Sequence, residues 1–265
     1  MPTATRSVSP SSTPVAECEP EWQYVPHPGA SRVEDITAIS RNAAMAVTTD
    51  TIYYWNGGGW DVMMHLTPSP VPTPNPPSLE YYSLKALSAY SATDVWAAGA
   101  HGDFGGNVFE YVMHWNGTEW STVHQGQAPH EAPQGGTLRY LFDIEALGPG
   151  EAVAVGGSYF NGPPLILRCT PTGCANDTPP DNFGPYNGVS ASSPNDIWVV
   201  GGSGVSLVAH FDGTTWQQVS TPDIGTLEAV VSIAPEDAWA GGTDGLLHWD
   251  GTSWSQYVGG PTPVY

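Results

Sequence analysis

Basic residues are scarce in this 265-residue chain, which has six Lys and Arg against 26 Asp and Glu and a formal net charge of -20. Such a charge repels phosphate backbones and anionic lipid, which argues against nucleic acid as a partner. Uninterrupted apolar stretches of the ~18 residues needed to cross a bilayer are also absent, so no membrane insertion is expected. The acidity is read as a solubility feature of a salty or calcium-containing medium, with a specific role in calcium binding as the alternative.

Recognisable catalytic motifs are missing as well. The sequence contains no G-x-S-x-G, H-E-x-x-H, P-loop or dinucleotide fingerprint. A sialidase needs three arginines around a carboxylate, and beyond the first 20 residues the chain offers only Arg32, Arg41, Arg139 and Arg168. No catalytic residue and no metal ligand is therefore assigned. A glycan-processing hydrolase or lyase remains an alternative, with a carboxylate pair such as Asp103 and Glu131.

Turn-forming and aromatic residues are abundant instead. The chain has 31 Gly, 26 Pro, 11 Trp and 12 Tyr, while charged residues make up only 12%. This composition is typical of an all-β protein with many tight turns.

One pattern recurs along the chain. It reads P-N-D-I-W-V-V-G-G and then H-F-D-G-T-T-W around Trp198, and P-E-D-A-W-A-G-G and then H-W-D-G-T-S-W around Trp239. A further copy at Trp96 reads D-V-W-A-A-G and then H-W-N-G-T-E-W. Two weaker copies, around residues 44–60 and 151–174, lack the first tryptophan. Such a period marks a repeat architecture.

Each copy divides into four β-rich runs, named A to D in chain order. Run B contains D-x-W, run C ends at H-W, and run D begins at T-x-W. Asn-Gly or Asp-Gly stands between C and D, which suits a tight hairpin that needs positive φ. Four strands in a unit of roughly 40 residues form one propeller blade. The sequence therefore predicts an all-β fold, a β-propeller of about five four-stranded blades.

Three histidines and three aspartates recur at fixed places in these copies. His114, His210 and His248 stand at one position of run C, and an aspartate precedes each run-B tryptophan. Because active sites break repeat symmetry, the histidines are interpreted as structural. The aspartates Asp94, Asp196 and Asp237 are interpreted as acceptors that cap turns.

Two of the three cysteines fall at aligned positions. Cys169 and Cys174 occupy the places that Trp115 and Trp120 hold in another copy, so a disulfide across the C–D hairpin is geometrically plausible. Free thiols, or a C-x4-C metal half-site without a second half, are the alternatives. Cys18 is left over, either unpaired or bonded outside this chain.

The repeat resembles that of secreted bacterial β-propeller proteins whose blades read D-V-W-A-V-G and then H-W-D/N-G-T-x-W, loosely related to kelch-like propellers. The resemblance covers residues 21–260 and implies the architecture, but no particular activity, because that group is mostly uncharacterised. Residues 1–20 are rich in Ser, Thr and Pro and read as a linker, with the propeller at 21–265. The linker points to a longer secreted protein and to an extracellular or cell-surface location.

The sequence does not determine how the first and last blades join into a ring. Residues 21–25 read as a run D standing before the first run A, which adds a strand to the last blade or belongs to a blade further upstream. Five blades is the prediction, and a partial propeller completed by a partner is the competing interpretation.

Length variation is concentrated in the B–C and D–A connections, which share one face of a four-stranded meander. Such variation usually marks a binding surface, although unconstrained drift is the other reading. Aromatic faces with carboxylates and amides suit sugar rings and, nearly as well, a protein. The predicted ligand-binding residues on this face are His101, Asp103, Phe104, His130, Glu131, Tyr159, Phe160, Asn161, Asn182 and Phe183.

The leading functional hypothesis is a non-catalytic extracellular binding propeller that recognises glycans or proteins through this face, without a cofactor unless calcium takes part. Attachment to a larger surface protein or assembly is expected from the linker. A structural module of a bacterial surface or extracellular polymer is the second hypothesis.

Overall fold

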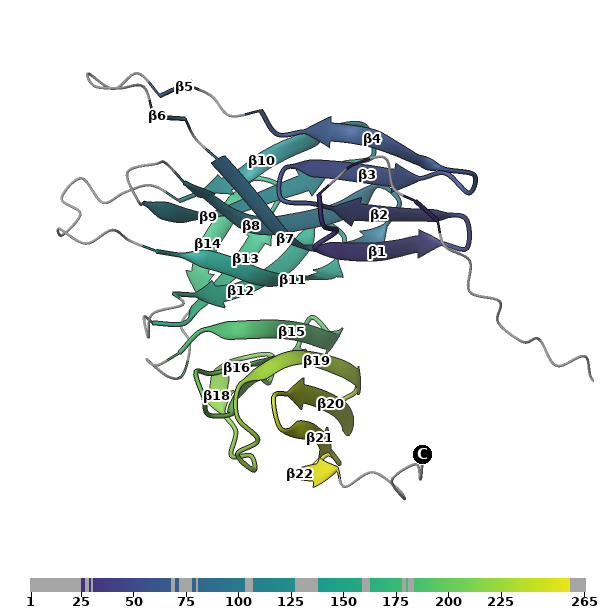
Figure 1. Cartoon of the computed structure of the whole chain (residues 1–265). Coiled ribbons are helices and arrows are strands. Elements are labelled where there is room, and N and C mark those ends of the chain that lie inside the picture. The colour runs from purple at the N-terminus through teal and green to yellow at the C-terminus, as the bar shows by residue number, and fades with distance from the viewer. Residues whose placement is uncertain are drawn as a thin grey trace, which may run out of the picture.

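The chain folds as a five-bladed β-propeller, described here from a computed structural model (Figure 1). The structure describes residues 25–26, 29, 31–67, 70–71, 78–79, 81–102, 107–126, 138–158, 163–177, 180 and 184–257. Five antiparallel four-stranded sheets follow one another along the chain, as the repeat predicts. Within these ranges no helix is long and apolar enough to cross a membrane.

The strands of each blade run in chain order from inside to outside, and they correspond to runs A to D. Blade 1 consists of β1 (Asp35–Ser40), β2 (Ala43–Val47), β3 (Thr51–Trp55) and β4 (Trp60–His65). Blade 2 consists of β7 (Tyr81–Ser91), β8 (Asp94–Gly102), β9 (Val108–Trp115) and β10 (Trp120–Gln125). Blade 3 consists of β11 (Tyr140–Gly148), β12 (Glu151–Gly157), β13 (Leu165–Thr170) and β14 (Gly173–Asp177). Blade 4 consists of β15 (Tyr186–Ser193), β16 (Asp196–Gly201), β17 (Leu207–Phe211) and β18 (Trp216–Gln218). Blade 5 consists of β19 (Leu227–Ala234), β20 (Asp237–Gly242), β21 (Gly245–Trp249) and β22 (Trp254–Tyr257). A short ribbon of β5 (Pro70–Val71) and β6 (Ser78–Leu79) lies between blades 1 and 2 in the chain.

The C–D hairpins share one hydrogen-bonding scheme. In blade 4 the Oδ1 atom of Asp212 accepts bonds from the backbone N–H groups of Thr214 and Thr215, both at 2.9 Å. Asn56, Asn116 and Asp250 make the same two bonds in blades 1, 2 and 5. Gly213, which follows Asp212, has a φ of 90°, a conformation that glycine adopts readily. The Asn-Gly and Asp-Gly pairs of the sequence therefore form short turns of the same hydrogen-bonded shape in these four blades.

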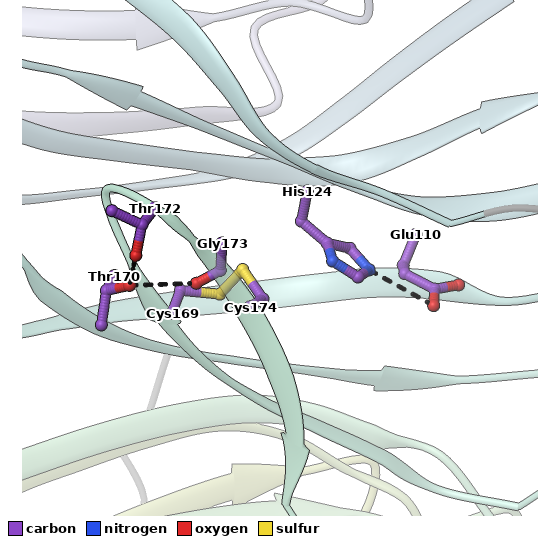
Figure 2. Close-up of a disulfide and its surroundings, with 7 residues drawn as sticks. All are labelled: Glu110, His124, Cys169, Thr170, Thr172, Gly173 and Cys174. Carbon is purple, nitrogen blue, oxygen red and sulfur yellow. Dashed lines mark hydrogen bonds and ion pairs between the residues drawn. A yellow bond between two sulfur atoms is a disulfide. The ribbon is translucent and has the colours of Figure 1, made fainter.

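Blade 3 closes the corresponding hairpin covalently. Cys169 of β13 is directly opposite Cys174 of β14, and their sulfur atoms form a disulfide (Figure 2). In blade 2 the same register pairs Trp115 with Trp120, whose ring centroids lie 5.9 Å apart. The disulfide thus replaces a cross-strand aromatic pair.

The recurrent histidines and aspartates form a repeated contact. Nε2 of His114, His210 and His248 lies 2.5 to 3.0 Å from Oδ1 of the aspartate that begins the preceding strand. Each imidazole also lies over the run-B tryptophan of its blade, with centroids 4.2 to 4.3 Å apart. The aspartates, expected as turn caps, mainly orient these histidines. Two of them also cap turns, as predicted: Oδ2 of Asp94 accepts the N–H of Gly150 in the next blade at 2.6 Å, and Oδ2 of Asp196 accepts the hydroxyl of Ser192 in the A–B turn of its own blade.

In the part of the chain that the structure describes, the hydrophobic core forms four clusters, one between each pair of consecutive blades. We call the side of a blade that packs against the next blade in the chain its leading face, and the opposite side its trailing face. Between blades 2 and 3, the leading face supplies Trp96 and Val112, and the trailing face supplies Ile144 and Leu167. Because every central blade buries both faces, its B strand is apolar almost throughout rather than alternating.

The ends of the series lack this packing. Among the described residues, no cluster joins blade 5 to blade 1. Figure 1 shows the two blades at opposite ends of the row of sheets. Residues 21–24, predicted as most of an additional D-type strand, lie outside the described residues, as does Cys18.

Side chains on the inner strands connect neighbouring blades near the axis. At each of the four interfaces, an inner-strand side chain of one blade accepts a hydrogen bond of 2.7 to 3.0 Å from a backbone N–H of the next inner strand. The pairs are Asp35 with Leu87, Ser88 with Ala146, Asp143 with Val189, and Ser190 with Ser232. Burial raises the pKa of Asp143 to about 7, although two backbone N–H groups oppose the shift.

Unequal burial at one repeat position provides a test of the packing. Ile166 of blade 3 is fully buried, whereas Leu246, at the same place in blade 5, is 46% exposed. We expect Ile166→Ala to lower the free energy of unfolding by about 2–5 kcal/mol and Leu246→Ala by less than about 1 kcal/mol. Urea unfolding at low protein concentration measures both, and equal losses would contradict the assigned packing.

Buried Asp143 predicts a dependence of stability on pH. Because its folded-state pKa is raised to about 7, the stabilisation is complete at acidic pH and is lost as the pH rises through about 7. Burial raises the pKa of Asp35 and Glu145 as well, which adds an effect of the same sign. We expect the free energy of unfolding to fall between about pH 4, near the pKa of an unfolded aspartate, and about pH 7, by up to ~1.4 kcal/mol per pH unit for one proton. Asp143→Asn flattens this slope, and an unchanged slope in the variant would show that other groups cause it.

Candidate functional site

The predicted binding face is described only at its base. Of the ten ligand-binding candidates, the structure describes His101. The other nine lie outside the described residues: Asp103, Phe104, His130, Glu131, Tyr159, Phe160, Asn161, Asn182 and Phe183. The site is therefore built from the residues at which these connecting segments leave the blades and return to them.

His101 lies near the end of β8, just before residues 103–106. Its side chain is buried, and Nε2 is 3.0 Å from the backbone oxygen of Gly126. Nδ1 is 3.4 Å from Nε2 of Gln125, and the ring packs beside Phe109 and Tyr111. His101 thus links the B strand to the start of the D–A connection, and its ring belongs to the wall beneath the face.

A buried carboxylate lies beside this link. Glu110 of β9 has Oε1 3.5 Å from Nε2 of His124 and Oε2 3.4 Å from Nε of Arg139. Burial raises the pKa of Glu110, but the hydrogen bond from His124 and the positive charge of Arg139 outweigh it, so the pKa lies below its ordinary value. Glu110 therefore remains ionised at neutral pH and holds the two cationic or donor side chains in place.

Backbone contacts bring both connecting segments to this carboxylate. The N–H of Gly126 donates to the backbone oxygen of Glu110 at 2.9 Å, where the chain enters residues 127–137. The N–H of Arg139 donates to the oxygen of Val108 at 3.0 Å, where the chain leaves them. Val108 in turn follows the B–C segment. The Arg139 guanidinium also reaches Asn176 of blade 3, with NH2 3.5 Å from Oδ1. We call the set of His101, Glu110, His124 and Arg139 the blade 2 cluster.

The blade 2 cluster can support a binding surface from below and form part of its lining. His124 and Arg139 are partly exposed, with side chains 22% and 38% accessible, and both can donate hydrogen bonds to a ligand oxygen. Figure 2 shows the His124–Glu110 pair on the sheet next to the hairpin closed by Cys169 and Cys174. In the described part of the chain, no group of three His, Cys, Asp or Glu side chains is placed to hold a metal ion.

Sequence reasoning missed Glu110 and Arg139. Neither belongs to the repeated motif, because β8 and β9 extend beyond the length that the other blades share. The available signal was an acidic residue within the apolar run V-F-E-Y-V-M, since an isolated buried carboxylate requires partners.

A second polar arrangement joins blades 3 and 4. Nε of Arg168 lies 3.0 Å from Oδ2 of Asp177, which also accepts the indole N–H of Trp216 at 2.9 Å. The guanidinium carbon is 4.2 Å from the centre of the Phe211 ring. Arg168 stands at the repeat position that His114 occupies in blade 2. It borders a pocket of about 270 Å³ together with Glu151. Because these contacts secure an interface between blades, we assign them to stability.

Comparisons with known proteins identify the fold and no family. No family model matches the chain, and no curated protein matches it. Among solved structures, the SapL1 lectin in complex with alpha methyl fucoside is similar, with 12% identity, a TM-score of 0.50 and coverage of 82% of this chain and 76% of the lectin. YCF48 bound to D1 peptide has 16% identity, a TM-score of 0.45 and coverage of 90% and 88%. The RRP9 WD40 repeats have 11% identity, a TM-score of 0.42 and coverage of 84% and 77%. Identities this low concern the β-propeller fold alone.

The close approach of Gly126 to Glu110 generates a prediction about the blade 2 cluster. A Cβ at Gly126 would lie 2.7 Å from Cδ and from Oε2 of Glu110, so Gly126→Ala must displace the carboxylate from Arg139 and His124. We expect a loss of about 1–3 kcal/mol in the free energy of unfolding. Gly59→Ala is the control, because a Cβ there meets nothing within 4 Å, and it should change stability by less than about 0.5 kcal/mol. Chemical denaturation of both variants tests this, and a neutral Gly126→Ala would mean that the cluster adapts without cost.

Proposed function

We propose that the chain is an extracellular, non-catalytic binding propeller that recognises a glycan or a protein through the face formed by its B–C and D–A connections. The observation that carries this proposal is the blade 2 cluster. It fixes the ends of the connections at residues 103–107 and 126–139 around one ionised carboxylate and leaves two donor side chains partly exposed.

The contrast between the two rims of the propeller supports this choice of face. On one rim, four C–D turns repeat the same pair of hydrogen bonds and present nearly the same short loop. On the other rim, the connection between β20 and β21 is two residues long, whereas residues 126–139 separate β10 from β11. Variable loops on a rigid scaffold are where binding residues usually concentrate.

The composition of the variable connections fits a sugar or a protein surface. Tyr159 and Phe160 offer flat apolar faces, and Asn161 offers an amide, in a single B–C segment. Aromatic faces pack against the C–H groups of sugar rings while amides and carboxylates bond to hydroxyl groups. Asp103 and Glu131 also supply the carboxylates that calcium would require, so calcium is tested alongside the ligand.

The disulfide between Cys169 and Cys174 supports an extracellular location, because such bonds persist in oxidising compartments. Residues 1–20 act in this proposal as the linker to a larger surface protein or assembly. Several weak sites held together in that way would gain affinity through avidity.

A glycan-array screen of the whole chain, with calcium and again with chelator, tests the proposal. The probes include alpha methyl fucoside, which the similar SapL1 lectin binds in its structure. We expect binding to a defined sugar, weakened about tenfold by Arg139→Ala or Phe160→Ala, which equals about 1.4 kcal/mol. Arg32→Ala is the control, because Arg32 is an exposed arginine that pairs with Glu34 in blade 1.

The outcomes of this screen separate the alternatives. Binding that survives both substitutions would place the ligand elsewhere on the propeller. A blank array in both conditions would contradict the glycan version and direct the search to a protein ligand. Products detected by mass spectrometry after incubation with the bound glycan would contradict the non-catalytic assignment.

A further inference from the structure

Blade 3 breaks the repeat where blades 2, 4 and 5 form their aspartate–histidine contact. In those blades, Oδ1 of the aspartate that begins the B strand lies 2.5 to 3.0 Å from Nε2 of the run-C histidine. The strand register places Glu151 at the aspartate position of blade 3 and Arg168 at the histidine position. Among the described residues, Glu151 makes no hydrogen bond or ion pair, and Arg168 pairs with Asp177 instead.

The residue that replaces the run-B tryptophan leaves room at this place. Val153 lies opposite Arg168 in the ladder, as Trp96 lies opposite His114 in blade 2. In blade 2 the imidazole covers the indole, with ring centroids 4.3 Å apart. Valine offers no ring to cover, and the Arg168 guanidinium extends instead to the Phe211 ring of blade 4, 4.2 Å away. The volume that two rings and a carboxylate fill in blade 2 is therefore not filled in the same way in blade 3.

A pocket of about 270 Å³ lies at this position, and we call it the blade 3 pocket. Alternation along the strands places Glu151 on the same face as Val153, and Thr170 on the same face as Arg168. Val153 belongs to the cluster between blades 3 and 4, so this is the leading face of blade 3. Thr170 begins the turn drawn in Figure 2, which puts the pocket at the rim of the C–D turns. The pocket is lined by Leu147, Glu151, Ala152, Arg168, Cys169 and Thr170.

The blade 3 pocket offers one unused acceptor and is bordered by one side chain with an unused donor. The exposed carboxylate of Glu151 accepts hydrogen bonds and donates none when it is ionised. Arg168 commits Nε to Asp177, whereas its Nη2 is buried and has no hydrogen-bond partner. A buried donor without a partner costs free energy, which a ligand oxygen would recover. Leu147 adds apolar surface beside these groups.

We propose that the blade 3 pocket binds one unit of a neutral sugar, with one hydroxyl group donating to Glu151 and a neighbouring hydroxyl accepting from Arg168. Hydroxyl groups both donate and accept, so a pair of them matches a carboxylate beside a guanidinium. The opposite charges of these two residues offset each other, and the net charge of -20 disfavours an anionic ligand. A zwitterion matches the pair as well, but it must lose the hydration of two full charges, which costs more than the desolvation of hydroxyls.

This site lies on the rim opposite the B–C and D–A face, and it does not depend on the function proposed for that face. The repeat itself supports the assignment. Structural contacts recur from blade to blade, as the three histidines do, whereas this acid–base pair occurs in one blade and leaves its members apart.

Saturation-transfer NMR on the full chain tests the proposal with the methyl glycosides of fucose, mannose and galactose as probes. Each is offered at millimolar concentration, because two hydrogen bonds in a small pocket support weak binding. We expect at least one probe to bind and Glu151→Ala to weaken it about tenfold, since the carboxylate accepts one of the two bonds. The fold should be unaffected, because Glu151 is exposed and unpaired. Glu236→Ala is the matched control, an exposed glutamate in the A–B turn of blade 5 on the same rim.

Arg168→Lys is the second variant. Lysine keeps the positive charge and the aliphatic stem, but it lacks the planar fork that can serve Asp177 and a ligand at once. We expect about tenfold weaker binding of the same probe, with circular dichroism unchanged. Should this variant fail to fold, Glu151→Ala still decides the question.

Each remaining outcome supports or overturns the proposal. Loss of binding in Glu151→Ala but not in Arg139→Ala assigns the sugar to the blade 3 pocket, whatever the opposite rim binds. Loss in Arg139→Ala but not in Glu151→Ala would assign it to the B–C and D–A face and overturn the proposal made here. The absence of any bound probe would also overturn it. Binding of glycine in place of the sugars, abolished by Glu151→Ala, would show that the pocket takes a zwitterion.

Discussion

The packing of one blade face on the next is the interaction on which the rest of this structure depends. A single four-stranded sheet of this type has apolar side chains on both faces and cannot bury either by itself. This requirement explains why β8 and β16 are buried along their whole length, whereas an outer strand such as β10 has only half-buried and exposed positions. It also explains why the core is divided into four interfacial clusters instead of one centre. Stability in such a molecule is mainly a sum over neighbouring pairs.

The buried aspartates in this packing each have hydrogen-bond partners, whereas the indole N–H groups of Trp96 and Trp198 are buried without one among the described residues. Asp94 orients His114 within its own blade and accepts a backbone N–H from the next one, so a single carboxylate serves both the sheet and the interface. Asp143 makes a comparable inter-blade bond at the inner strands, where burial favours its protonated form. Blade 3 dispenses with the histidine and uses Arg168, held by Asp177, in its place. The repeat therefore tolerates different chemistry at one position as long as the buried group retains a partner.

The sequence predicts the fold well because its signals are local. Asn-Gly and Asp-Gly specify the hairpins, the aligned tryptophans mark the strands, and the alignment of Cys169 with Trp115 places the two cysteines opposite each other. The contact between Glu110 and Arg139 is not predictable from the repeat. Glu110 lies in the part of β9 that extends beyond the repeated motif, and Arg139 comes at the end of a long D–A connection. The exposure of Leu246 is not predictable from the sequence for a different reason. Its local pattern matches that of the central blades, and only its place at the end of the series determines what covers it.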